Sequence, residues 1–440
     1  MPNAEGAEVV ETASRQDAED RGWCLCLSGG GFRATLFHLG VIQRLNELGV
    51  LARLSTITSV SGGSILNGVL ATRWARLNLG SDGKYINLEE EIARPVRSFC
   101  SKDLRTPILL GTRLNPANWP VLIQDWFSVS ANFLAEGYEP LFRMALSELP
   151  AYGPHMPRFV FCATNVRTGA CWHFHGGPAA RMGDFYTGYC DAGHVRVSDA
   201  VAASSAFPPG FSAFRLSLPT GVTFSRTDQW GENRVVSAKR AKQHPGDAKQ
   251  PVLLTDGGVY DNMAVEPVWN SYKTLLVSDA GRPFATVRES SQSLITRLKR
   301  VIDISMEQVA AVRKRWLVAD FSHGRRTGAI WALHTRLEDF PLADSRGYGD
   351  TARGLLHSVR TDLDAFTEGE IACLENHGYS LADAALRSRA PTICTNLMAP
   401  FRWPHDQWCD DITVQSALAK SAKRRIGRDL CRFFFGSTPR

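Results

Sequence analysis

The segment LSTITSVSGGSILNGVL, residues 54–70, joins an apolar strand to a helix through a short turn that contains glycine. A serine on such a turn has its hydroxyl lifted out at the edge of the sheet, where a substrate can approach. Ser59 still belongs to the strand, and Ser64 falls about one turn into the helix. Ser61 occupies the turn itself, so we predict that Ser61 is the serine with a chemical role.

The neighbours of Ser61 suit a nucleophile. Gly62 and Gly63 follow it directly and leave the beginning of the helix open beside its side chain. The pattern GxSxG, typical of nucleophilic serines on strand-to-helix turns, is met except at its first position, where Ser59 replaces glycine. Serine is small, so this departure weakens the match without breaking it. Alone, the short motif also fits an ordinary structural turn.

Strands and helices alternate over much of the chain. WCLCLS (23–28) is typical of a buried strand, and LFHLGVIQRLNELG (36–49) of a helix that ends at a glycine. Further apolar runs predict strands at 158–166, 170–176, 251–256, 273–279 and 328–333. This alternation predicts an α/β protein with a mostly parallel central sheet covered by helices. Its ligand site is expected at the carboxyl ends of the strands.

A glycine-rich turn, SGGGFRA (28–34), lies between the first strand and the first helix. Three consecutive glycines expose backbone N–H groups at the positive end of a helix, which suits either a phosphate or the oxyanion of an acyl-transfer transition state. A Walker loop needs GxxxxGK[ST], and a dinucleotide site needs GxGxxG with an acidic residue about 20 positions later. Neither pattern is present. The motif therefore favours an oxyanion site, with a purely structural turn as the alternative.

A third motif, LLTDGGVYDN (253–262), ends a predicted strand on Asp256. A carboxylate at the carboxyl end of a buried strand would share the edge of the sheet with the two motifs above. Gly257 and Gly258 would let a substrate or another backbone segment come close. Asp256 could otherwise cap the turn, and Asp261 is more typical of the turn itself.

The three motifs together resemble those of the patatin-like phospholipase family. SGGGFRA, SVSGGS about thirty residues later and the DGG of a later strand carry the resemblance. FCATNVRTG (161–169) and AVAASSAFPPGF (200–211) extend it to roughly residues 22–380. The family implies a three-layer α/β/α fold with a helical insertion and a helical C-terminal region. Its members are lipid acyl hydrolases that use a serine and aspartate dyad.

By this resemblance Ser61 would be the nucleophile and Asp256 the base, with Gly29, Gly30 and Gly31 supplying the oxyanion hole. Arg33, Gly62, Gly63, Gly257 and Gly258 would lie near the site. The chain departs from the family pattern at two positions, because Ser59 stands where glycine is common and Ser28 where many relatives have aspartate. The implied activity is cleavage of fatty acyl esters, of phospholipase A or lysophospholipase type, without a cofactor or metal.

Other functions remain open at this point. An acyltransferase or transacylase would use the same acyl-enzyme, and a regulated membrane-damaging effector or toxin would use the same dyad. A non-catalytic module would use the glycine turn only to bind an anion. A histidine relay, as in ordinary serine hydrolases, has no obvious candidate, since His38 lies within the first helix and His173 and His175 alternate along a strand.

Composition indicates a globular protein, with 44% apolar and 21% charged residues and a net charge of +6. Charges of both signs are mixed along most of the chain, so no nucleic acid partner is expected. The ten cysteines lack the spacing of a zinc site or a disulfide framework. The N-terminal residues lack the features of a signal peptide, and no apolar run reaches the ~18 residues of a membrane span. We expect a cytoplasmic protein that contacts membranes peripherally; its oligomeric state is not indicated.

The expected organisation is a polar N-terminal arm (1–21), an acyl hydrolase domain (22–400) and a basic, aromatic tail (401–440). Within the domain, 85–150 is expected to be a helical insertion and 286–400 a mainly helical C-terminal part.

Two segments have the composition of membrane contacts. The tail has six basic residues between Lys420 and Arg432, followed by FFF, and the insertion has Trp119, Trp126 and Phe127. A solvated helix face is the alternative for the tail.

Overall fold

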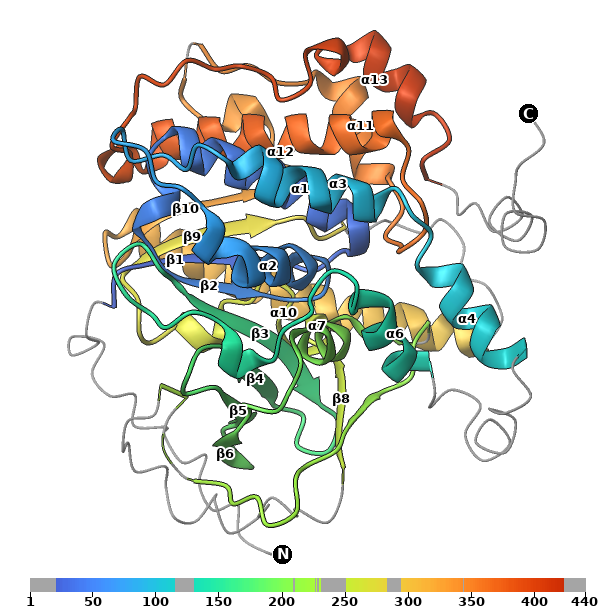
Figure 1. The fold of residues 1–440 in the computed structure, drawn as a ribbon. Coiled ribbons are helices and arrows are strands. Elements are labelled where there is room, and N and C mark those ends of the chain that lie inside the picture. Colours follow the sequence, from blue (N-terminus) through green and yellow to red (C-terminus); the bar gives the residue numbers. More distant parts are fainter. Residues whose placement is uncertain are drawn as a thin grey trace, which may run out of the picture.

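The fold is built on one ten-stranded sheet with helices on its faces (Figure 1). The strands are β1 (Trp23–Leu27), β2 (Leu54–Ser59), β3 (Arg158–Asn165), β4 (Cys171–His175), β5 (Arg181–Asp184), β6 (Gly188–Asp191), β7 (Phe214–Leu216), β8 (Val252–Asp256), β9 (Thr274–Asp279) and β10 (Thr327–Ala332). The computed structural model describes residues 21–114, 130–208, 210–225, 227, 229–230, 251–282, 294–342 and 344–422.

The centre of the sheet is parallel, as expected. β10, β9, β1, β2 and β3 are neighbours in this order and run in the same direction. Parallel neighbours need a crossover connection, which a helix usually provides. Here α1 (Gly31–Glu47) joins β1 to β2, and α10 (Leu294–Ser322) joins β9 to β10. Beyond β3 the sheet continues with the antiparallel strands β4, β5 and β6.

The two faces of the sheet are covered by different helices. Successive side chains of a strand point to opposite faces. Leu25 and Leu27 of β1 accordingly belong to the large core that contains α1, whereas Cys24 and Cys26 pack in a separate cluster with Leu317 of α10. The other α-helices of the described residues are α2 (Gly62–Arg73), α3 (Arg94–Cys100), α4 (Arg105–Leu114), α6 (Ser130–Tyr138), α7 (Val197–Ser205), α9 (Gly258–Asp261), α11 (Asp350–Ser358), α12 (Glu368–Arg389) and α13 (Asp411–Leu418).

The long C-terminal helix α12 lies directly against α1 (Figure 1). A Cβ atom on Gly40 or on Gly378 would collide with the backbone of the facing helix, so glycine is needed at both positions. A buried ion pair joins the same helices, with Arg44 Nη2 2.6 Å from Asp383 Oδ1. The C-terminal part of the chain is therefore integral to the α1 side of the sheet.

β2 and β8 lie end to end along one edge of β3. β4 pairs with residues 160–164 of β3, β2 with residues 158–161 and β8 with residues 163–165. Because β4 overlaps both of the others, it occupies one edge of β3 and leaves the opposite edge to β2 and β8. β2 is parallel to β3 and β8 is antiparallel to it, so β2 and β8 point toward each other and their carboxyl ends meet.

Several predicted segments lie partly outside the described residues. The insertion contains α3, α4 and α6, but residues 115–129, with Trp119, Trp126 and Phe127, are not described. Two further ranges are not described: residues 1–20 of the N-terminal arm, and residues 423–440, which include most of the basic cluster of the tail. Among the helices of the described part, none has the length and apolar character needed to cross a bilayer.

Candidate active site

The turn after β2 holds Ser61 in a strained backbone conformation. β2 ends at Ser59 and α2 begins at Gly62, so Val60 and Ser61 alone make the turn. Ser61 has φ 50° and ψ −119°. A non-glycine residue in such a sparsely populated region costs of order 1–3 kcal/mol, and strain of this kind gathers at active sites. Ser61 is half-buried, and its setting between a strand and a helix is that of a nucleophile elbow.

Gly62 and Gly63 bring this turn against the glycine-rich turn that follows β1. A Cβ atom on Gly62 would collide with the carbonyl oxygen of Gly31. A Cβ atom on Gly63 would lie 2.7 Å from the carbonyl oxygen of Ser28, to which the Gly63 N–H donates at 3.1 Å. The two glycines predicted beside Ser61 are therefore required by the close contact between the two turns.

Asp256 is the last residue of β8, and its carboxylate lies beside Ser61. Asp256 pairs with Ala163 of β3, two positions beyond Phe161, which pairs with Ser59. The Ser61 side chain is near enough to the Asp256 carboxylate to lower its pKa. The sequence predicted Asp256 at this edge of the sheet. The structure brings it there on an antiparallel strand that arrives from the opposite direction.

Burial makes Asp256 a stronger base than an ordinary carboxylate. Asp256 is 2% exposed, and the loss of hydration raises the pKa of its carboxyl to about 7. Hydrogen bonds from the Gly258 N–H, at 2.7 Å from Oδ1, and from Ser61 lower the pKa and offset part of this effect. A general base works best when its pKa lies near the operating pH. Asp256 is thus suited to accept a proton at neutral pH.

The DGG turn is crowded on both sides. A Cβ atom on Gly257 would collide with the carbonyl oxygen of Cys162, and one on Gly258 would lie 2.7 Å from Asn262 Oδ1. Asp261 is buried, and its carboxylate accepts hydrogen bonds from the N–H groups of Met263, Val265 and Glu266. Asp261 therefore stabilises the turn, as its sequence context indicated.

Ser204 of α7 supports the backbone of Ser61, although no sequence motif pointed to it individually. The Ser61 N–H donates to Ser204 Oγ at 3.0 Å, and Ser204 Oγ donates to the carbonyl oxygen of Cys162 at 2.6 Å. Ser64 Oγ lies 2.9 Å from Ser204 Oγ and donates to Ser59 Oγ at 2.9 Å. Ser59, which replaces the glycine of the motif, is thus part of a buried hydroxyl network beneath the turn. The serine pair in AVAASSAFPPGF was the available signal.

Among the described residues, no histidine is hydrogen-bonded to Ser61 or Asp256. The ring nitrogens of His38 lie 2.8 Å from Ser278 Oγ and 3.0 Å from the Ser28 carbonyl oxygen, and burial lowers the His38 pKa to about 4. His173 and His175 are buried on β4, two strands away from β2. Within the described part of the chain, no histidine therefore connects Ser61 to Asp256.

The N–H groups of the glycine turn differ in their availability. The Gly29 N–H donates to the carbonyl oxygen of Asn262 at 3.0 Å and is therefore occupied. The N–H groups of Gly30 and Gly31 have no acceptor within the described residues, and both glycines are half-buried. Gly30 and Gly31 have φ values of 146° and 60°, and α1 begins at Gly31. These two donors lie at the positive end of a 17-residue helix, next to the Ser61 turn.

A sequence model described as patatin-like phospholipase matches residues 25–269, more than half of the chain. The chain belongs to the patatin-like phospholipase family. Membership supports lipid acyl hydrolase activity in general terms. No curated protein sequence matches the chain.

Solved structures with similar folds share little sequence with this patatin-like protein. Human GIVD cytosolic phospholipase A2 in complex with methyl gamma-linolenyl fluorophosphonate has a TM-score of 0.44 and 14% identity, covering 91% of this chain and 60% of that chain. Another structure of the human enzyme has a TM-score of 0.37 and 13% identity, covering 58% and 42%. VipD from Legionella pneumophila has a TM-score of 0.34 and 15% identity, covering 82% and 66%. The chain thus spans less than two thirds of either human chain.

Arg33 of this patatin-like protein, just after the glycine turn, forms hydrogen bonds inside the protein. The side chain is fully buried, and its guanidinium donates to the carbonyl oxygens of Val359 at 3.0 Å and Ala280 at 2.9 Å. Burial lowers its pKa to about 10. The sequence predicted Arg33 near the oxyanion hole. The hydrogen bonds of Arg33 hold the C-terminal part and the end of β9 against α1.

Ser28, the other departure from the family pattern, has a structural role. Its hydroxyl accepts a hydrogen bond from the Ala280 N–H at 2.7 Å, and its N–H donates to the Ser278 carbonyl oxygen at 3.1 Å. The end of β1 is thereby tied to the end of β9.

In the described part of the chain, no group of three or more His, Cys, Asp or Glu side chains is arranged to hold a metal ion.

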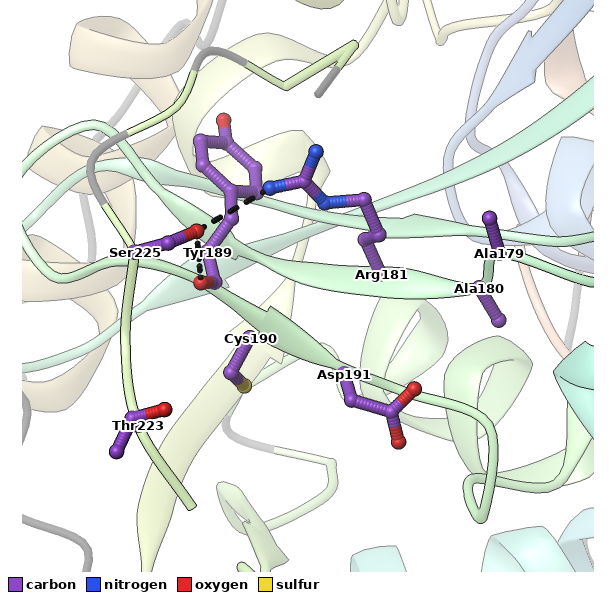
Figure 2. A pocket seen from close by; sticks show the side chains of 8 residues that line it. All are labelled: Ala179, Ala180, Arg181, Tyr189, Cys190, Asp191, Thr223 and Ser225. Carbon is purple, nitrogen blue, oxygen red and sulfur yellow. Dashed lines mark hydrogen bonds between the residues drawn. The ribbon is translucent and has the colours of Figure 1, made fainter. Parts of the chain in front are cut away.

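A cavity of about 300 Å³ lies on the antiparallel extension of the sheet (Figure 2). It is lined by β5, β6 and the segment around Ser225, where Arg181 Nη2 donates to Ser225 Oγ at 3.4 Å. β3 and β4 lie between these strands and β2. The cavity is therefore separate from the Ser61 and Asp256 pair.

Proposed function

We propose that this protein is a lipid acyl hydrolase of phospholipase A or lysophospholipase type, in which Ser61 is the nucleophile and Asp256 the general base. The observation that carries the proposal is the pairing of a strained serine with a buried carboxylate whose pKa is about 7. The strained backbone of Ser61 and the buried carboxylate of Asp256 each lower the stability of the fold. Together they would activate the Ser61 hydroxyl.

In the first half-reaction, Ser61 Oγ attacks the carbonyl carbon of the ester while Asp256 accepts the hydroxyl proton. The tetrahedral intermediate then collapses, its carbon–oxygen bond to the alcohol breaks, and the leaving alkoxide takes the proton from Asp256. The products are a lysolipid or free alcohol and an acyl-enzyme on Ser61.

In the second half-reaction, water attacks the acyl carbonyl and Asp256 accepts the proton of that water. Collapse of the second intermediate breaks the bond to Ser61 Oγ, which takes the proton back from Asp256. The fatty acid is released and the dyad returns to its starting state.

The negative oxygen of both intermediates is assigned to the N–H groups of Gly30 and Gly31. These donors are uncommitted among the described residues, whereas the Gly29 N–H is occupied by Asn262. One oxyanion donor is worth about 2.7–4 kcal/mol of transition-state stabilisation. Esters need less activation than amides, which suits a dyad whose base is a carboxylate.

Labelling with a fluorophosphonate tests the proposal directly, with mass spectrometry to locate the modified residue. The expected result is a single modification at Ser61 that is lost in Ser61→Ala and strongly slowed in Asp256→Asn. Labelling of the folded protein at another serine, with Ser61 unmodified, would overturn the assignment. Adding a lipid alcohol and analysing the products distinguishes hydrolysis from acyl transfer, since a transacylase would yield the new ester.

A further inference from the structure

Helix α10 is much longer than the sheet that it crosses. Its 29 residues span about 43 Å at 1.5 Å per residue. The six-residue strands β9 and β10, which it connects, span only about 20 Å. Because these two strands are parallel, α10 runs from the carboxyl edge of the sheet back to the amino edge. The surplus length of α10 extends past one of these edges.

The contacts of α10 place the surplus beyond the carboxyl edge. Lys314 Nζ lies 2.6 Å from the carboxylate of Asp279, the last residue of β9. Arg313 Nη1 donates to the carbonyl oxygen of Tyr260 at 2.9 Å, in the short helix α9 that directly follows the DGG turn. The residues before Arg313 therefore project by up to about 30 Å past the edge at which Ser61 lies. Figure 1 shows α10 extending beyond the ends of the central strands.

Most of the exposed apolar side chains of α10 lie on one face, while Ile304 and Val318, 41% and 50% exposed, lie on other sides of the helix. Val301, Ile302 and Val309 are 58%, 49% and 40% exposed. Val301 and Ile302 precede Val309 by eight and seven residues, which places all three on the same side of the helix. Trp316, 57% exposed, lies on that side seven residues after Val309. We call Val301, Ile302, Val309 and Trp316 the outer stripe. Large apolar groups gathered on an exposed face mark a contact surface.

The charge of α10 suits an anionic partner. The helix contains six basic and three acidic residues. Arg313 and Lys314 are paired with carboxylates of the protein, whereas the side chains of Arg297 and Arg315 are exposed. An exposed helix that combines an apolar stripe with arginine and lysine is the type that lies in the headgroup layer of a membrane. Each basic residue near an anionic bilayer surface contributes about 1 kcal/mol to binding.

We propose that the outer stripe of α10 is a membrane-contact surface that inserts into an anionic bilayer and holds the Ser61 edge of the sheet toward its lipid. The inference rests on the proposed function, because a lipid substrate resides in the bilayer that this edge would face. A second copy of the chain, or a segment of the chain outside the described residues, would be a different occupant of the stripe.

Sedimentation with vesicles of phosphatidylcholine and the anionic lipid phosphatidylglycerol tests the inference. The protein carries Ser61→Ala, so that the lipid stays intact. The variant Val301→Ser, Ile302→Asn, Val309→Ser is expected to bind at least about tenfold more weakly than the background protein, since three apolar side chains no longer enter the membrane. The matched control Met398→Gln, Ile412→Asn replaces side chains that are 89% and 81% exposed elsewhere and is expected to bind unchanged. Equal binding by the stripe variant and the background protein would overturn the inference.

Two further measurements test the alternatives, in which a second copy of the chain or another segment of the same chain covers the outer stripe. If the stripe variant changes the oligomeric state in light scattering and leaves vesicle binding unchanged, the stripe contacts a second copy. If it lowers the melting temperature and leaves vesicle binding unchanged, the stripe is covered by the chain itself. Either result contradicts membrane contact.

The activity of a stripe variant that retains Ser61 keeps this inference separate from the proposed function. On a short, water-soluble p-nitrophenyl ester the variant is expected to work within about twofold of the wild type. Hydrolysis of vesicle lipid is expected to fall with binding. Full activity of Ser61→Ala on the soluble ester would refute the proposed function, while the vesicle-binding result would still stand.

Discussion

Ser61 and Asp256 meet because the strands that precede them point toward each other along the same edge of β3. β2 ends two residues before Ser61, and β8 ends on Asp256 itself. A shift of β8 by one residue would turn Asp256 to the opposite face of the sheet. The pairing of β8 with β3 therefore determines whether a carboxylate lies beside Ser61.

Replacement of Ser61 by alanine is expected to reduce ester hydrolysis by about 10⁴-fold or more, because the nucleophile is lost. The fold is expected to remain, since the change removes one hydroxyl from a half-buried residue. Rates with p-nitrophenyl esters and a thermal melt measure the two effects. Ser64→Ala, near the beginning of α2, is the control and should retain far more activity. A fully active Ser61→Ala protein would exclude Ser61 as the nucleophile.

The rate should depend on the ionisation of Asp256, whose carboxyl has a pKa of about 7 because of burial. The base must be deprotonated, so kcat/KM is expected to fall about tenfold per pH unit below about pH 7 and to level off above it. A pH–rate profile measures this directly. A flat profile between pH 5 and pH 7 would argue against a base with this pKa.

Asp256→Asn is expected to inactivate the protein and yet to stabilise it above neutral pH. The folded-state pKa of Asp256, about 7, exceeds the ordinary value of about 3.9, so the wild type loses stability as pH rises from about 4 through about 7. Asparagine carries no charge and escapes this loss. The melting temperature of the variant should exceed that of the wild type at pH 8, and the difference should shrink toward pH 4. His173→Gln, as a comparison, should not match the loss of activity.

Ser204→Ala is expected to weaken the Ser61 turn. The change leaves the Ser61 N–H without its acceptor and removes the hydroxyl bonded to Cys162. The loss of a buried hydrogen-bond partner costs about 1–3 kcal/mol of stability. Ser205→Ala is the matched control, because the Ser205 hydroxyl bonds within its own helix, to the Val201 carbonyl oxygen. If kcat falls equally in both variants, Ser204 has no special relation to the turn.

Arg33→Met is expected to act on stability more than on catalysis. It leaves the buried carbonyl oxygens of Ala280 and Val359 unpaired, and each unsatisfied group costs about 1–3 kcal/mol. Denaturant unfolding measures the loss, and kcat/KM of the folded fraction should change by less than about tenfold. Unchanged stability with lost activity would instead place Arg33 in the site.

Local sequence patterns were sufficient for most of the elements. The strands around Leu25, Leu254 and Leu276 and the helix after the glycine turn were expected from runs and spacings of apolar residues and are present in the structure. The position of Ser61 between strand and helix was likewise local. Such features depend on side chains within a few residues of each other, so they can be recognised without knowing the fold.

The direction of β8, the use of the Gly29 N–H by Asn262, the support of Ser61 by Ser204 and the projection of α10 were decided by the tertiary structure. Each depends on groups about ninety or more residues apart, or on the relative lengths of elements that must be packed before they can be compared. The sequence by itself determined which residues are candidates for the chemistry. Tertiary packing decided which hydrogen-bonding groups remain free to perform it, because a donor or acceptor is available only if no distant backbone group has already paired with it.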